Sequence, residues 1–344
     1  MTIKHIIVTG AGGWLGRHLI QALLNPSDSN MTSPIMALNP MIHGIYHPND
    51  IPTLPIQCYK ADITNADSIK SALSSIPNEA SIIIHTAGVI HPRHPRDFFD
   101  VNTQGTKHVL NAIQKFSSIK FIYISSNSPC GCNPHHNHIF TEDSPYNPYM
   151  NYGKSKQQAE QLFQQTNVLD YTILRPPWFY GPNQPARQTL FFKLIQSGKF
   201  PILGMGKQRR SMVYLDNLVQ GIMRACLSSN SKRQTYWISD ENSYSMQDII
   251  STVKICLLEA GFHVSKTQLR LPYFLGTIAQ WCDFLLQSCN IYHQKMHVLS
   301  EMNKTIACDI SKAKQELGYV PMISIKEGMQ RSIKWCMESK LLVP

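Results

Sequence analysis

The sequence predicts an α/β fold in which a doubly wound parallel sheet is joined to a smaller, interleaved C-terminal substrate lobe. Three observations predict this class. The chain has 344 residues, more than one domain usually holds. Apolar runs alternate with helical segments through the first half, as in parallel sheets covered by helices on both faces. A glycine-rich turn follows the first run. The expected strands are HIIVTG (5–10), IQCYKAD (56–62), SIIIHTAG (81–88), KFIYISS (120–126) and DYTILRP (170–176).

The turn after the first run, TGAGGWLGRHL, places Gly10, Gly13 and Gly16 between a strand and a helix. Glycine suits these positions because the turn is tight, a pyrophosphate must approach the backbone, and the helix must pack closely on the strand. The flanking strand and helix supply the context that the motif requires. The turn therefore predicts a dinucleotide site that includes Trp14 and Leu15.

The Gly-x-x-Gly-x-x-Gly spacing resembles that of the extended short-chain dehydrogenase/reductase family, in its NAD-dependent epimerase/dehydratase and 3β-hydroxysteroid dehydrogenase-like branch. Other segments keep that family's order. Asp62 and Ile63 look like the pair that receives the adenine ring. HTAG, with Ala87, looks like the loop over the middle of the cofactor, and VNTQGT looks like the helix with a structural asparagine, here Asn102.

The resemblance also implies a division into domains. A Rossmann-like cofactor domain is expected over 1–176, completed by a returning strand near 235–240. The substrate lobe is expected to combine 177–234 with 250–340. The segment LRPPWFYGP (174–182) resembles the family's crossing between the two parts.

The sequence leaves the choice between NAD and NADP open and leans toward NADP. An acidic residue closing the second strand binds the ribose hydroxyl of NAD, whereas a basic one accommodates the phosphate of NADP. Between residues 25 and 49 the strand is either IMALN, ending at Asn39, or IHGIYH, ending at His47. Neither end supplies the acidic residue.

The catalytic chemistry is predicted from YGKSK, where Tyr152 and Lys156 lie four residues apart and so share one helical face. A nearby ammonium is expected to lower the pKa of the phenol toward working pH, as proton transfer requires. The resemblance implies that Tyr152 is the general acid/base, that Lys156 is its electrostatic partner and holds the nicotinamide ribose, and that both contact the cofactor. It also implies a polarising serine; the family's interval back from Gly131 selects Ser126 over Ser125.

The loop SSNSPCGCNPHHNH (125–138) crowds two cysteines and three histidines together. Its Cys-x-Cys and His-His-x-His spacings match none of the usual structural zinc sites, so we expect no metal. We expect Cys130 and the histidines to line or cover the substrate pocket instead.

Two residues bear on the substrate and point in different directions. Trp178 stands where sugar-nucleotide enzymes of the family commonly have Asn, which favours another substrate. Arg210, in RSMVYLDN, resembles their arginine segment and is able to grip a diphosphate bidentately.

The function expected from these features is NAD(P)-dependent hydride transfer at a secondary alcohol or ketone, with a sterol-like or other alicyclic alcohol slightly preferred. One alternative is a nucleotide-sugar epimerase or dehydratase that uses transient oxidation. A second is a cofactor-binding sensor or scaffold without catalysis, although such proteins usually lose the Tyr or Lys.

Composition narrows the partners to a small-molecule substrate. The net charge is +10, but the basic residues are dispersed, which argues against nucleic acid. The nine cysteines are scattered, as in a reduced cytoplasmic protein. A homodimer through the helices around VNTQGT and YGKSK is common among similar proteins.

The longest apolar tract, 271–291, is interrupted by Gln280, Asp283 and Gln287, so a membrane-spanning helix is not expected. A buried or amphipathic helix is favoured over peripheral membrane contact. The residues able to form an interfacial face are Tyr273, Phe274, Leu275, Trp281, Phe284 and Leu285.

Overall fold

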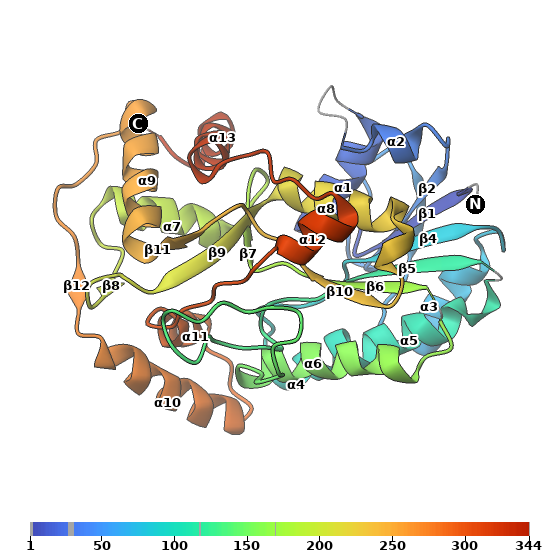
Figure 1. The fold of residues 1–344 in the computed structure, drawn as a ribbon, viewed down its shortest axis with the longest axis horizontal. Coiled ribbons are helices and arrows are strands. Elements are labelled where there is room, and N and C mark those ends of the chain that lie inside the picture. The colour runs from blue at the N-terminus through green and yellow to red at the C-terminus, as the bar shows by residue number, and fades with distance from the viewer. Residues whose placement is uncertain (1–2, 27–30, 117, 169, 344) are drawn as a thin grey trace.

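The computed structural model describes residues 3–26, 31–116, 118–168 and 170–343 (Figure 1). Within these residues, seven parallel strands form one sheet in the order β10-β6-β5-β4-β1-β2-β3. This order confirms the predicted doubly wound α/β class. The strands are β1 (His5–Thr9), β2 (Met41–Tyr46), β3 (Gln57–Lys60), β4 (Ser81–His85), β5 (Ile119–Ile124), β6 (Tyr171–Arg175) and β10 (Gln234–Trp237).

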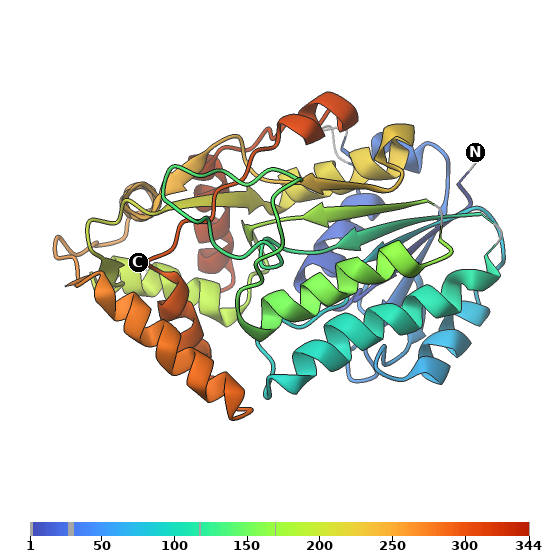
Figure 2. The same ribbon diagram turned by 60° about the horizontal axis from the view of Figure 1, so that its bottom comes forward.

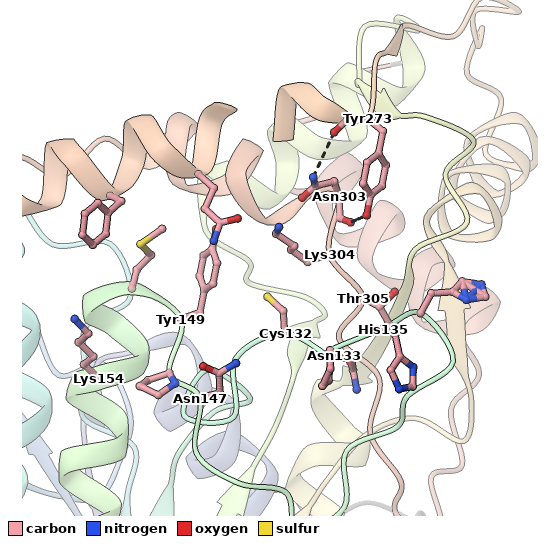
Figure 3. Close-up of a pocket in the computed structure, with 16 residues that line it drawn as sticks. Cys132, Asn133, His135, Asn147, Tyr149, Lys154, Tyr273, Asn303, Lys304 and Thr305 are labelled. Carbon is pink, nitrogen blue, oxygen red and sulfur yellow. Dashed lines mark hydrogen bonds between the residues drawn. The ribbon is translucent and has the colours of Figure 1, made fainter. Parts of the chain in front are cut away.

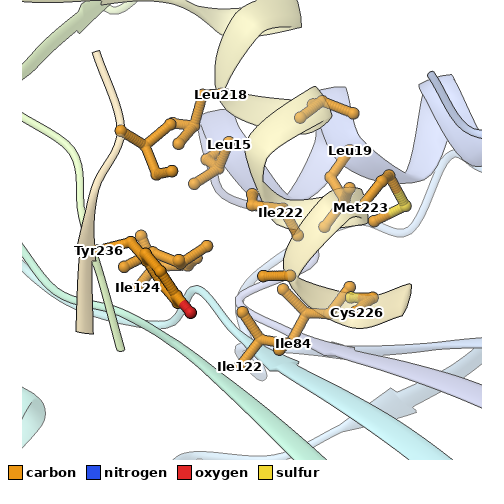
Figure 4. Packing of buried hydrophobic residues seen from close by; sticks show 14 of the residues in the cluster. Leu15, Leu19, Ile84, Ile122, Ile124, Leu218, Ile222, Met223, Cys226 and Tyr236 are labelled. Atoms are coloured by element: carbon orange, nitrogen blue, oxygen red, sulfur yellow. The ribbon is translucent and has the colours of Figure 1, made fainter. Parts of the chain in front are cut away.

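Helices cover both faces of this sheet. One face carries α1 (Trp14–Leu24) and α8 (Leu215–Leu227), whose Leu15, Leu19, Leu218 and Ile222 pack on the strands (Figure 4). The remaining helices of this first part of the chain are α2 (Ser33–Met36), α3 (Ala66–Ser74), α4 (Arg96–Phe98), α5 (Thr106–Ala112) and α6 (Met150–Gln165), with a π-helical stretch at Phe99–Gly105 and a short 3₁₀ turn at Ile113–Lys115. The other face is covered by α3, α5 and α6.

The second lobe has its own core around smaller sheets, β11-β9-β7 and β12-β8. Its strands are β7 (Trp178–Tyr180), β8 (Ile202–Leu203), β9 (Arg209–Tyr214), β11 (Ser243–Ser245) and β12 (Arg270–Leu271). Its helices and those near the C-terminus are α7 (Ala186–Gln196), α9 (Met246–Glu259), α10 (Phe274–Ser288), α11 (Gln294–Glu301), α12 (Ser311–Leu317) and α13 (Ile325–Glu338), and a 3₁₀ turn lies at Ser229–Ser231. Figure 1 shows α9, α10 and α13 at the end of the molecule away from the large sheet.

The lobes are interleaved along the chain. Strand β10 returns to pair with β6, as expected. Helix α8 lies within 177–234, the segment expected in the substrate lobe, yet it packs on the large sheet. It does so because it carries the chain from the second lobe back to β10 and buries an apolar face on the way. The exact domain boundaries stay a prediction.

The structure decides between the two candidates for the second strand. Residues 33–36 form α2, and Asn39 has a positive φ of 51°, so IMALN is not a strand. Strand β2 instead runs from Met41 to Tyr46, so it begins one residue before IHGIYH and ends one residue before His47. Residues 27–30 of this irregular segment lie outside the described residues.

Candidate functional site

The glycine turn forms a cradle in which a side chain has no room. Gly10 has a φ of +71°. The N–H of Gly13 donates to the carbonyl of Gly10 at 2.9 Å and closes the turn. A Cβ on Gly16 would lie 2.2 Å from Gly10 O, and one on Gly10 would lie 2.7 Å from Cα of Ala87. The backbone is thus open to a pyrophosphate at the start of α1, where helix amides favour negative charge. This geometry fits a dinucleotide.

The two residues inside the turn have different surroundings. Leu15 points into the sheet core, so only its backbone is available to a ligand. Trp14 donates from Nε1 to the carbonyl of Pro182 at 2.6 Å, and its ring lies 5.0 Å from that of Phe179. Trp14 therefore ties the cradle to the second lobe.

Asp62 and Ile63 follow β3 at the same carboxyl edge of the sheet. The Asp62 carboxylate accepts from the backbone N–H of Thr64 at 2.9 Å and from its hydroxyl at 2.8 Å. Ile63 is buried, and His108 Nδ1 lies 2.9 Å from its carbonyl. These contacts hold the pair in place, and its role in an adenine pocket stays a prediction.

An acidic residue that sequence reasoning missed lies beside the cradle. Asp50, four residues beyond β2, accepts from the N–H of His47 at 3.2 Å. A Cβ on Gly12 would be 2.3 Å from its Oδ2. Arg17 also reaches this corner and donates to Gly12 O at 3.1 Å. Sequence reasoning missed Asp50 because it looked for an acidic residue at the end of the strand, whereas the strand ends at Tyr46 and Asp50 follows four residues later.

Tyr152 lies in the first turn of α6, close to the hydroxyl of Ser126. Burial raises the pKa of Tyr152 to about 12, and a hydrogen bond with Ser126 acts in the opposite direction. The charges of Glu301 and Arg187 contribute smaller opposing effects. The expectation of a lowered tyrosine pKa is therefore wrong for this structure, because desolvation of the phenol outweighs the favourable contacts.

Lys156 is buried one turn further along α6. Its Nζ donates to the carbonyl of Ile124 at 2.9 Å and to the hydroxyl of Tyr123 at 3.3 Å. Burial lowers its pKa to about 8, although Glu160 acts the other way. A Cβ on Gly88 would lie 3.5 Å from this amine, so Lys156 reaches the HTAG loop. Asn102 supports the same loop, because its amide exchanges two hydrogen bonds with Val89.

The two candidate serines face different neighbours. Ser125 donates to Oε1 of Glu160 at 2.5 Å, and Glu160 forms a buried ion pair with Arg175 at 2.6 Å. The hydroxyl of Ser126 instead lies near Tyr152, and it is 3.3 Å from Oγ of Ser128 and 3.4 Å from Oδ1 of Asn127. Ser125 is therefore part of a buried polar network, and the role of Ser126 toward a substrate stays a prediction.

Residues from three distant segments lie near Tyr152. The ring of Phe98 lies 5.6 Å from that of Tyr152 and 5.5 Å from that of Tyr292. The hydroxyl of Tyr292 is 2.6 Å from Nδ1 of His91. Burial, followed by the charge of Arg187, lowers the pKa of His91 to about 3. Sequence reasoning missed this group because no motif links positions 91, 187 and 292.

Trp178 and Arg210, the predicted substrate residues, are both anchored by the protein. The Trp178 ring lies 5.3 Å from that of Phe191, edge to face. Arg210 is buried and donates from Nη2 to the carbonyl of Glu301. Their roles toward a substrate stay predictions.

The cysteine- and histidine-rich loop borders a pocket of about 500 Å³ that also includes Tyr273, Phe284 and Lys304 (Figure 3). Cys132, His135 and His136 line it, whereas Cys130 is buried away from it. The catalytic candidates Ser126, Tyr152 and Lys156 are not among its lining residues. Asn133 ties the loop down through hydrogen bonds with Thr305 and Ala307.

Metal ligands do not converge here. Among the residues that the structure describes, no group of three or more His, Cys, Asp or Glu side chains is arranged to hold a metal ion. Within the same residues, no helix has the length and apolar character needed to cross a membrane.

Comparison with known proteins places the chain in a family. The model of the NAD dependent epimerase/dehydratase family matches residues 6–239. "Uncharacterized protein y4nL" of Sinorhizobium fredii is 42% identical over 97% of this chain and 95% of its own length. The N-acetyl-alpha-D-glucosaminyl-diphospho-ditrans,octacis-undecaprenol 4-epimerase of Escherichia coli O157:H7 is 24% identical over 96% of this chain and 95% of its own.

Solved structures show the same fold. The UDP-glucose 4-epimerase of Thermotoga maritima, solved with UDP-glucose, has a TM-score of 0.74 at 19% identity and covers 98% of this chain and 99% of its own. The UDP-glucuronic acid 4-epimerase of Bacillus cereus, in complex with NAD, has a TM-score of 0.71 at 24% identity over 97% and 99%. With the family match over most of the chain, the protein belongs to the NAD-dependent epimerase/dehydratase family of short-chain dehydrogenase-type enzymes.

Proposed function

We propose that this enzyme oxidises and re-reduces a hydroxyl-bearing carbon of a diphosphate-linked sugar, and so changes its configuration. The observation that carries the proposal is the meeting of Ser126 with Tyr152, one turn from Lys156, at the carboxyl edge of the sheet that holds the glycine cradle. Support for the sugar class comes from the epimerases named above, which act on or bind such substrates. This substrate class was the first alternative from the sequence.

The chain's own residues would handle the proton. Tyr152 accepts it from the substrate hydroxyl and returns it, and Ser126 donates a hydrogen bond to the same oxygen. Lys156 supplies positive charge and a donor for the cofactor's ribose. A bound nicotinamide would supply the hydride acceptor and donor. Its positive charge in the oxidised state would also act against the burial that raises the pKa of Tyr152.

Arg187 and Arg210 are proposed to meet the negative charge of the substrate. Arg187 interacts electrostatically with Tyr152 and Tyr292, so it lies near the reacting oxygen. Burial lowers its pKa, which an anionic ligand would offset. Arg210 has donors beyond the one bound to Glu301.

The substrate class is tested by supplying UDP- and dTDP-sugars with NAD and resolving the products by chromatography. We expect a stereoisomer of the substrate and no net accumulation of NADH. Calorimetry should show that the wild type binds the same sugar nucleotide. Arg210→Ala should lose this affinity, and Arg210→Lys should retain part of it. Absence of both binding and turnover across the panel would remove the sugar-nucleotide proposal.

Trp178 keeps the dehydrogenase alternative open. Its ring occupies the position where sugar-nucleotide enzymes commonly have Asn. The 2-alkyl-3-oxoalkanoate reductase of Shewanella oneidensis is 25% identical over 96% of this chain and 85% of its own length. A dehydrogenase would accumulate NADH in proportion to product, so the same assay separates the two classes.

For the cofactor we propose NAD, against the leaning from the sequence. The carboxylate of Asp50 beside Gly12 suits a ribose hydroxyl and would repel a phosphate, although Arg17 lies in the same corner. A ligand at a hundred times its dissociation constant stabilises a protein by about 2.7 kcal/mol. We expect NAD to raise the melting temperature more than NADP at equal concentration, and Asp50→Asn to narrow that difference. A larger rise with NADP would contradict the proposal.

A further inference from the structure

Helix α10 presents an apolar stripe to its surroundings. Phe274, Ile278, Trp281 and Leu285 follow each other at helical spacing and are 59%, 50%, 67% and 61% exposed. Tyr273 and Phe284, also exposed, lie beside this stripe. Figures 1 and 2 show α10 at the edge of the second lobe with no other element covering its outer side. A contiguous apolar face of this kind marks an interaction site.

The inner face of α10 fixes this orientation. The buried positions are Gly276, Ala279, Asp283 and Gln287. Asp283 is 2.7 Å from Nδ1 of His297 and accepts from Gln287 at 3.0 Å. A Cβ on Gly276 would lie 2.4 Å from Cγ of Asn303, so the helix sits close to the protein there. Rotating the stripe inward would move Asp283 out to solvent and leave His297 buried without its partner. This is unfavourable because a buried charge must keep its counterpart.

The surroundings of the stripe are basic. Asp283 is the one charged residue of α10, and it is buried. Arg270 is exposed four residues before the helix, and Lys295 is exposed six residues after Cys289. Lys154 and Lys304 line the pocket beside Phe284.

A second basic group lies at the far end of α10. The N–H of Arg96 donates to Asn290 at 3.4 Å, which brings the exposed Arg93 and Arg96 to this end of the helix. Asp97, 3.9 Å from Arg96, offsets part of this charge. The overall charge of the chain is +10.

A second copy of the chain is a poorer partner for this face. Stable homodimer interfaces bury roughly 2,000 Å² or more and are apolar over their centre. The helix that lies on the same side in Figure 2, α6, is polar outward. Its exposed residues are Lys154, Gln158, Gln164 and Gln165.

We propose that α10 docks this enzyme on an anionic membrane surface, lying in the plane of the interface with its stripe among the lipid headgroups. Aromatic and aliphatic side chains on one helical face, with cations around them and no exposed acid on the helix, are what an anionic bilayer attracts. The C-terminal end of α10 lies near the candidate reaction site, since Tyr292, four residues after the helix, packs through Phe98 toward Tyr152. The proposal is independent of the substrate proposed above.

The test uses the full chain and vesicles made of phosphatidylcholine alone or mixed with phosphatidylglycerol. We expect the enzyme to sediment with the mixed vesicles, and a smaller fraction of it to sediment with vesicles of phosphatidylcholine alone. High salt should lower the fraction that sediments with the mixed vesicles. Trp281→Glu should lower the partition coefficient by about tenfold or more, because it removes apolar contact and adds a negative charge.

The matched control is Leu258→Glu on α9, which adds the same charge at a position 57% exposed. It should bind vesicles as the wild type does. Phe274→Glu serves as a second stripe variant, and a thermal shift with NAD verifies that each variant is folded. No binding to the mixed vesicles, or equal binding by Trp281→Glu and wild type, would overturn the proposal. So would a dimer that Trp281→Glu converts to monomer without any vesicle binding, since the stripe would then belong to a second copy.

Discussion

Helices α6 and α10 lie on the same side of the molecule and distribute their side chains in opposite ways (Figure 2). Helix α6 buries Lys156 and Glu160 and turns glutamines outward. Helix α10 buries Asp283 and Gln287 and turns its apolar residues outward. In both helices the buried polar groups have partners, as burial of charge requires. The buried polar groups of α6 belong to the proposed reaction site and to the ion pair with Arg175, whereas those of α10 fix the orientation of the helix.

The largest expected effect concerns the inner face of α6. Tyr152→Phe should lower kcat by about 10²- to 10⁴-fold and change NAD affinity far less, because the proton acceptor is lost while the glycine turn and Lys156 remain to hold the cofactor. Steady-state kinetics on a sugar nucleotide that the proposed panel shows to be turned over, and an NAD thermal shift, measure the two quantities. Tyr149→Phe, which removes a hydroxyl 2.7 Å from Ser300, is the control and should keep most of kcat. Equal turnover by both variants would show that α6 does not carry the chemistry.

The inner face of α10 should respond in stability instead. Asp283→Ala leaves His297 and Gln287 without their buried partner. The free energy that holds α10 against the rest of the protein should therefore fall by about 3–5 kcal/mol. Hydrogen exchange is expected to rise throughout α10, with a smaller change in α6. Glu338→Ala, which removes a surface ion pair of 4.0 Å with Lys334, should change little. Unchanged exchange in α10 would mean that the ion pair does not hold the helix.

Lys156 offers a test of what a buried catalytic charge does to stability. Burial lowers its pKa from 10.5 to about 8, so between pH 8 and 10.5 the folded chain binds fewer protons than the unfolded chain, and stability rises with pH in this window. Below pH 8 the buried ammonium carries its full penalty. The free energy of unfolding of Lys156→Met, taken relative to that of the wild type, should therefore be about 1–3 kcal/mol higher at pH 7 than at pH 10.

This difference is measured as the change in melting temperature between variant and wild type at the two pH values. The variant lacks the two hydrogen bonds of Lys156 at both pH values, so their loss does not contribute to the difference between the two pH values. A pH-independent difference would show that Lys156 is solvated as a surface amine would be. Lys154→Met, on the exposed face of the same helix, is the control.

The smallest expected effect is the pH dependence of α10 itself. Burial alone would lower the pKa of His297, but its hydrogen bond with Asp283 and the charge of Glu301 raise it overall. A raised histidine pKa gives stability that is complete below the unfolded value of 6.5 and is lost as pH rises through the folded value. Hydrogen exchange in α10 should therefore be slower at pH 6 than at pH 8.5 after correction for intrinsic rates. His297→Gln should remove this difference, and a difference that persists would assign it to another group.

The sequence by itself determined the features that depend on local spacing. Alternating runs gave the parallel strands, three glycines gave the tight turn, and the four-residue interval placed Tyr152 and Lys156 on one helical face. These follow from backbone geometry within a few residues, which neighbouring side chains do not alter.

Only the tertiary structure decided the features that depend on contacts between distant segments. It placed Ser126 with Tyr152 and Ser125 with Glu160, brought Asp50 to Gly12, and gathered Arg187 and Tyr292 near the phenol. It also decided that the apolar side chains of α10 face outward, a choice that the sequence left open between a buried or amphipathic helix and an interfacial face. The physical reason is that burial and charge pairing are set by whichever segment arrives opposite, as Asp283 shows by meeting His297 and so fixing which face of its helix remains exposed.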